Sequence, residues 1–93
     1  MGPWPPAYRY RAEVLEGLAR HGLLPAPHTP PGDLRDAVRE LYKYEIRRLR
    51  DERLAGRIPK PEYAGRVVAL RRRYWLLSVP IERWVEATGD AGG

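Results

Sequence analysis

Cysteine is absent from this 93-residue chain, so neither a disulfide bridge nor a thiolate metal site can form within it. Histidine is scarce as well, because the chain has only His21 and His28, and no acidic residue stands next to either of them. Metal sites in proteins combine several His, Cys, Asp or Glu side chains. The sequence therefore predicts no metal site and no cofactor, and stability has to come from packing or from association with another chain.

Nucleophilic side chains are also few, with one serine and two threonines in the whole chain. They do not complete a serine–histidine–acid set, and no glycine-rich phosphate loop is present. Neighbouring carboxylates do occur, at Glu40 and Glu45 and at Asp51 and Glu52, but they stand close to basic residues. Such spacing is typical of charge pairs on a helix surface. The expected pairs are Asp36–Arg39, Glu40–Lys43 and Arg47–Asp51. We therefore predict no catalytic residues and a non-enzymatic protein.

Asparagine and glutamine are missing, whereas arginine outnumbers lysine fifteen to two and ten prolines are present. This thermophile-like composition makes part of the arginine excess a background property. No apolar run reaches the roughly 18 residues that a membrane-spanning helix needs. The N-terminal stretch MGPWPPAY also lacks the apolar core of a secretion signal. We expect a cytoplasmic protein without a membrane partner.

Helical periodicity is the dominant pattern, and we predict a single all-α domain over residues 1–93. A proline-rich arm at 1–7 precedes a helix over 8–21, which should end at Gly22 because glycine readily adopts the left-handed conformation. Residues 25–32 read as a proline-rich connector and residues 87–93 as a flexible tail.

Two longer amphipathic segments fill residues 33–77. The first ends at Gly56, and the second starts near Lys60. The second carries a seven-residue apolar repeat formed by Tyr63, Val67, Leu70, Tyr74 and Leu77. A last short helix opens at Ser78 and Pro80. The sequence thus predicts a long antiparallel helical hairpin flanked by a short helix on each side, arranged as a small helical bundle.

The connection LAGRIPKPEYAG, residues 54–65, and the segments on both sides of it have a definite spacing of glycine, apolar, acidic and aromatic residues. The residues concerned are Leu49, Gly56, Ile58, Glu62, Tyr63 and Leu70. Their spacing resembles the SHOCT motif, a short helical hairpin of bacterial proteins, over residues 46–77. Pro59 stands where that family usually has a capping threonine. The resemblance implies oligomerisation or interaction, and it implies no catalytic residues.

A second apolar stripe, made of Ala64, Val68 and Trp75, lies beside the main repeat. A helix with two apolar stripes is expected to contact two neighbours, and Tyr and Trp are enriched at contact surfaces. We therefore predict an interaction module that self-associates or docks on another protein. The predicted interface residues are Val68, Trp75 and Trp84. Arg71 falls between the stripes, where we expect an acidic partner such as Glu45 or Glu52.

Nucleic-acid binding is the alternative function. Residues 59–77 carry five basic residues and one acidic residue, and the formal net charge of the whole chain is +5. This charge suits a phosphate partner, which would be bound by the Arg-rich face of residues 60–73. The candidate phosphate-binding residues are Lys60, Arg66, Arg72 and Arg73. Arg66 and Arg73 share one side of the helix and Arg72 lies roughly 100° away, so we expect the first two to serve in charge pairs.

Overall fold

The computed structural model describes residues 7–86, and most of the predicted arm and the predicted tail at 87–93 lie outside this range. Three α-helices follow one another, α1 (Ala12–Arg20), α2 (Pro31–Leu54) and α3 (Lys60–Arg73). Two 3-10 turns come after them, η1 (Trp75–Ser78) and η2 (Ile81–Arg83). The described chain is mostly helical, which confirms the predicted all-α class.

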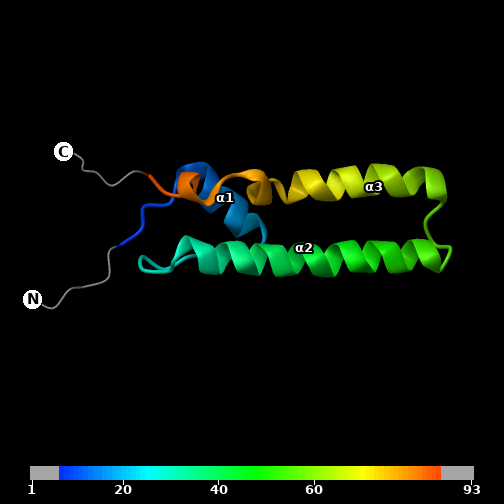
Figure 1. Cartoon of the computed structure of the whole chain (residues 1–93), viewed down its shortest axis with the longest axis horizontal. Helices are drawn as coiled ribbons and strands as arrows, with labels where there is room; N and C mark the ends of the chain where they lie inside the picture. The colour runs from blue at the N-terminus through cyan, green and yellow to red at the C-terminus, as the bar shows by residue number, and fades with distance from the viewer. Residues whose placement is uncertain (1–6, 87–93) are drawn as a thin grey trace, which may run out of the picture.

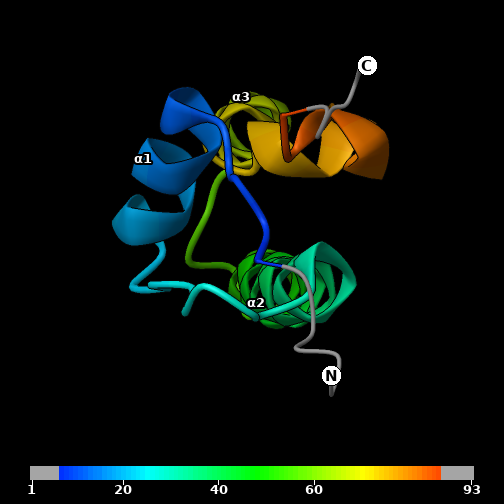
Figure 2. The same cartoon turned by 90° about the vertical axis from the view of Figure 1, so that its left-hand side faces the viewer.

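Helices α2 and α3 lie side by side in opposite directions, joined by the turn at residues 55–59 (Figure 1). Helix α1 packs at the other end of this pair, close to η1 and η2 (Figures 1 and 2). The molecule therefore has two different ends. We call them the capped end, where α1, η1 and η2 lie close together, and the turn end, where α2 and α3 pack on each other and no other described element lies against them.

The hydrophobic core is a single cluster to which α1, α2, α3, η1 and Trp84 all contribute. Its fully buried side chains are Trp84, Leu18, Leu76, Val14 and Val38, which come mainly from the elements of the capped end. Ile58, beside the turn, is the one buried hydrophobic residue of the described chain outside this cluster. Most of the apolar burial that stabilises the fold is thus at the capped end.

Gly17 allows α1 to approach η1 closely. A Cβ atom added to Gly17 would lie 3.1 Å from both Leu76 Cδ1 and Trp75 Cζ2. Glycine inside a helix costs about 1 kcal/mol relative to alanine. The close contact with η1 gives a physical reason for glycine at this position.

Both predicted glycine stops are present. Gly22 and Gly56 have positive φ angles of 78° and 79°. In each case the next residue closes the helix with a backbone bond five residues back, from the Leu23 N–H to Leu18 and from the Arg57 N–H to Glu52, both 2.9 Å long. Each bond satisfies a carbonyl that the helix end would otherwise leave unpaired.

The predicted start of the first helix at residue 8 is wrong, because residues 8–11 lie outside the helix and Arg11 is extended. Their backbone pairs with the end of the described chain: the Arg11 N–H donates to the Trp84 carbonyl at 3.0 Å, and the Glu86 N–H donates to the Arg9 carbonyl at 2.8 Å. These partners lie more than seventy residues away in sequence. Periodicity within one segment cannot reveal such a pairing.

The predicted boundaries 33–77 of the two long segments also need correction. Helix α2 begins earlier, at Pro31, and α3 ends earlier, at Arg73. Tyr74 leaves helical geometry with φ −103° and ψ 38°, and the chain then tightens into η1, which brings Leu76 into the core. The last short helix is reduced to the 3-10 turn η2. Burial of Leu76 at the capped end thus prevails over the local repeat, which alone would continue α3 to Leu77.

Candidate functional site

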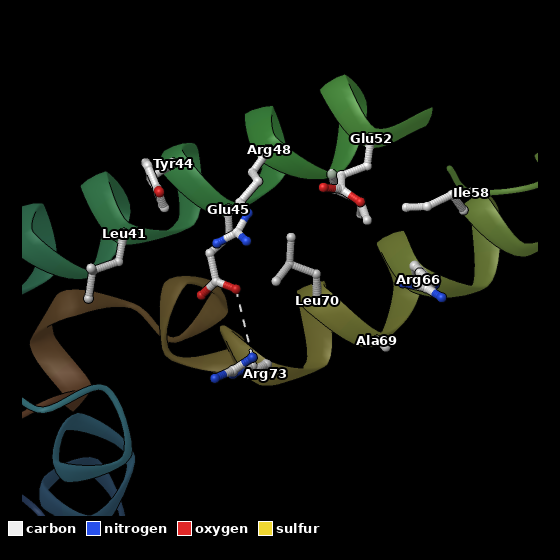
Figure 3. A pocket seen from close by; sticks show the side chains of 11 residues that line it. Leu41, Tyr44, Glu45, Arg48, Glu52, Ile58, Arg66, Ala69, Leu70 and Arg73 are labelled. Atoms are coloured by element: carbon white, nitrogen blue, oxygen red, sulfur yellow. Dashed lines mark ion pairs between the residues drawn. The ribbon is translucent and has the colours of Figure 1, made fainter. Parts of the chain in front are cut away.

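An open groove with a volume of about 710 Å³ lies between α2 and α3 (Figure 3). Helix α2 contributes a stripe at three- and four-residue steps, Leu41, Tyr44, Glu45, Arg48, Leu49 and Glu52. Helix α3 contributes the facing stripe Arg66, Ala69, Leu70 and Arg73, and Ile58 closes the turn end. We call this hollow the mixed-charge groove.

The groove has an apolar floor that its own two helices leave partly open. Leu70 projects from α3 toward α2 at its centre, and Leu41 and Ile58 lie toward opposite ends (Figure 3). Leu41 and Tyr44 count among the exposed large hydrophobic residues, and Tyr44 is 60% exposed. An exposed run of apolar side chains with a charged border is typical of a contact surface.

Charged groups of both signs border this floor. Arg73 pairs with Glu45 across the two helices at 3.7 Å, and Arg66 pairs with Glu62 along α3 at 3.6 Å. Arg48 lines the groove without an ion pair to any described residue. The groove therefore presents two acidic and three basic side chains, one of which is available for an outside partner.

Glu45 connects the groove to the capped end. The Tyr74 hydroxyl donates a hydrogen bond to Glu45, and the Tyr74 ring stacks on His21 with ring centroids 4.4 Å apart. Burial, the hydrogen bond to Glu45 and the negative charge of Glu45 together raise the pKa of Tyr74 to about 12, and the charge of Arg73 acts in the opposite direction. His21, Glu45 and Tyr74 thus link the end of α1, the middle of α2 and the end of α3 in one polar and aromatic cluster.

His21 makes this cluster sensitive to acid. Burial lowers the pKa of His21 below its ordinary value of 6.5, and the charge of Arg73 adds to this, whereas the Arg73 backbone and Glu45 act in the opposite direction. Because the unfolded chain then binds the proton more readily than the folded chain, the neutral form of His21 is favoured by folding.

Stability should therefore be full above about pH 6.5 and fall as the pH drops toward 5. Urea denaturation of the wild type at a series of pH values between 7 and 5 measures this loss. His21→Phe keeps an aromatic ring against Tyr74 and removes the titration, so its stability should change less over the same range. Parallel pH profiles for the two proteins would contradict a contribution from His21.

A second hollow opens elsewhere along the α2–α3 pair, with a volume of about 190 Å³. It is lined by Lys43, Ile46, Arg47, Arg50 and Tyr63, so three basic side chains and no acidic one surround it. We call it the basic cleft. Arg53 lies over the Tyr63 ring, 5.1 Å from its centroid, at the same part of the interface.

The three predicted interface residues do not form one surface. Val68 is 45% exposed on α3. Trp75 is half-buried and packs against the core beside Gly17 of α1. Trp84 is fully buried and donates its indole N–H to the Val79 carbonyl at 3.2 Å, so its assignment to an exposed interface is wrong for this fold.

The four candidate phosphate-binding residues point in different directions. Taking Tyr63 as the reference on α3, Lys60 is turned about 60° in one sense, whereas Arg66 and Arg73 are turned about 60–80° in the other. Arg66 and Arg73 accordingly line the mixed-charge groove, where both are in ion pairs. Arg72 lies about 180° from Tyr63, on the outer side of α3. The four candidate cations thus belong to one helix but do not share one face of it.

The predicted charge pairs are present in part. Asp36–Arg39 and Glu40–Lys43 are both found at 3.2 Å. The third predicted pair, Arg47 with Asp51, is missing among the ion pairs of the described residues.

The expected partner of Arg71 is also wrong. The partner of Glu45 across the helices is Arg73, and Glu52 pairs with Arg57 at 3.5 Å. Arg71 itself is exposed. The orientation of α3 about its axis decides this outcome. Arg71 and Arg73 are two residues apart, so they point about 160° away from each other, and it is Arg73 that faces Glu45.

Comparison of the chain with protein-family models, with curated proteins and with solved structures gives no match. The resemblance to the SHOCT motif therefore stays a prediction. Over residues 7–86, no group of three or more His, Cys, Asp or Glu side chains is placed to hold a metal ion. In the same range, no helix combines the length and the apolar character required to cross a bilayer.

Proposed function

We propose that this chain is a non-enzymatic helical interaction module that associates with a second copy of itself. The module is an antiparallel hairpin of α2 and α3 flanked by short helical elements, and the contact surface is the mixed-charge groove. The observation that carries the proposal is the combination, in one groove, of an apolar floor with charges of both signs.

The first argument concerns apolar surface. At the turn end, no third helix of the described residues lies against α2 and α3 (Figure 1). Leu41 and Tyr44 stay exposed, and Leu70 and Ile58 form a floor accessible from outside. A helix laid into such a groove is a common mode of recognition. The α2 stripe from 41 to 52 spans about three turns, or about 17 Å, which is enough to seat a helix segment of similar length.

The second argument identifies the partner as another copy. A two-fold interface places one surface against itself, so residue i of one copy meets residue j of the other and the reverse. With two α2 helices antiparallel and centred between positions 45 and 48, Glu45 of each copy faces Arg48 of the other. In the same register Tyr44 faces Leu49. The stripe thus supplies two opposite-charge contacts and two apolar contacts, together with two contacts between Leu41 and Glu52, and it gives the unpaired Arg48 a partner.

Arg48→Glu is expected to dissociate this dimer. The change places an acidic side chain opposite Glu45, so two attractive contacts become repulsive ones across the interface. Analytical ultracentrifugation at tens of micromolar, a range in which a dimer with micromolar Kd is populated, should show dimer for the wild type and monomer for the variant.

Arg47→Glu is the matched control, since it makes the same charge change one residue away on a side chain that lines the basic cleft instead. Its dimer should persist, and circular dichroism should show equal helicity for the three proteins. A monomeric wild type, or equal dissociation by both variants, would refute self-association through the mixed-charge groove.

A further inference from the structure

The basic cleft has a property that the mixed-charge groove lacks: every charge that lines it is positive. Its charged residues are Lys43, Arg47 and Arg50, all on α2. Lys43 has a partner in Glu40, but both side chains are at least half exposed and such pairs are weak in water. Arg47 and Arg50 make no ion pair with any described residue. Two arginines are therefore available for an anion from solution.

Helix α3 adds positive charge on the same side. Relative to Tyr63, which lines the cleft, Lys60 and Arg71 are turned about 60° and 80° in the sense opposite to the residues of the mixed-charge groove. Both are exposed and without an ion pair to a described residue. The cations on this side thus come from both helices and flank the cleft.

The arrangement of these cations favours a linear polyanion over a single small ion. Lys43, Arg47 and Arg50 follow one another at steps of four and three residues, which corresponds to about 6 Å and 4.5 Å along the helix. A row of cations at such intervals can neutralise successive phosphates of a chain. The lining contains no exposed large apolar side chain, because Ile46 and Tyr63 are half-buried, so the cleft offers nothing to insert into a lipid layer.

We infer that the basic cleft binds the phosphodiester backbone of nucleic acid without regard to sequence, with Arg47 and Arg50 as its main contacts. Base recognition is not part of the inference, because Arg53 lies over the Tyr63 ring. This inference goes beyond the proposed self-association and uses other residues. It also moves the phosphate-binding surface from the Arg-rich run of α3 to α2.

The test is an anisotropy titration of the full chain against labelled nucleic acids of about 20 nucleotides, one duplex and one single strand. Salt is set at about 50 and 200 mM, the range over which phosphate contacts weaken strongly. Arg47→Ala with Arg50→Ala removes two phosphate contacts. The salt slope for duplex should then fall by about two, so the affinity lost between the two salt concentrations should shrink by about tenfold.

Arg72→Ala with Arg83→Ala is the matched control, because it removes two exposed positive charges that line neither the basic cleft nor the mixed-charge groove. It should leave the salt slope close to that of the wild type. Equal effects of both double variants would mean that binding depends on net charge alone, and this would overturn the inference. A wild type that does not bind at about 50 mM salt would also overturn it. Binding to vesicles of phosphatidylcholine and phosphatidylserine in equal parts, with none to nucleic acid, would also overturn it. The dimer test described above is independent, since it needs no nucleic acid.

Discussion

Trp84→Ala is expected to unfold a large fraction of the molecules at room temperature. Trp84 is the largest fully buried side chain among residues 7–86, and removing a buried Trp or Phe side chain costs about 3–5 kcal/mol. Domains are stable by about 5–15 kcal/mol, and a chain of this length buries too little surface to be at the upper end of that range. Urea denaturation followed by circular dichroism should show a transition at much lower denaturant, or none.

Trp84→Phe serves as the control for this change. It retains an aromatic ring in the core and loses the indole N–H that bonds to the Val79 carbonyl, so its cost should be clearly smaller. A loss below about 1 kcal/mol for Trp84→Ala would contradict the burial of this side chain. Trp84→Ala would also abolish self-association because the chain unfolds, so a loss of the dimer in this variant would not show that Trp84 lies in an interface.

The parts of the fold that local chemistry determines could be predicted from the sequence. Gly22 and Gly56 end their helices in the left-handed conformation, as glycine readily does. Pro59 and Pro61 interrupt the chain between two amphipathic segments, and α3 starts at Lys60 between them. Each of these signals lies within one turn of the structure that it specifies.

The parts that depend on distant segments could not be predicted. The backbones of Arg9 and Arg11 pair with Glu86 and Trp84, and η1 replaces the last turn of α3 because Leu76 is buried in the core. The prediction of Trp84 as an interface residue is wrong for the same reason, because Trp84 is buried in the core of its own chain. Periodicity shows that a side chain seeks an apolar neighbour, but it does not tell whether that neighbour belongs to the same chain.

The candidate site depends on how α2 and α3 are turned toward each other. Arg73 reaches Glu45 across the helices, whereas Arg71, only two residues earlier, is exposed elsewhere. A composition count over residues 59–77 therefore adds charges that lie on different faces. The one useful signal in the sequence was the unequal helical spacing of Arg66, Arg72 and Arg73, which excluded a single flat basic face.

Leu70→Ala is the second large effect that we expect. Leu70 is 9% exposed, belongs to the core cluster and also lies in the floor of the mixed-charge groove, so it links the two ends of the α2–α3 pair. Truncation of a buried leucine to alanine costs about 2–5 kcal/mol, and here the open side of the groove lets water reach part of the space, which favours the lower half of that range. Urea denaturation at a protein concentration too low for the dimer to be populated measures the change without a contribution from dimer formation.

Val68→Ala is the matched control for Leu70→Ala, two residues away on the same helix and 45% exposed. Surface truncations of this kind usually change stability by less than about 0.5 kcal/mol. A large difference between the two variants is expected because α3 turns Leu70 toward α2 and Val68 away from it. Similar small losses for both would mean that α3 does not pack on α2 in this orientation. The mixed-charge groove and the basic cleft would then lose their basis together, since both are defined by that one rotation of α3.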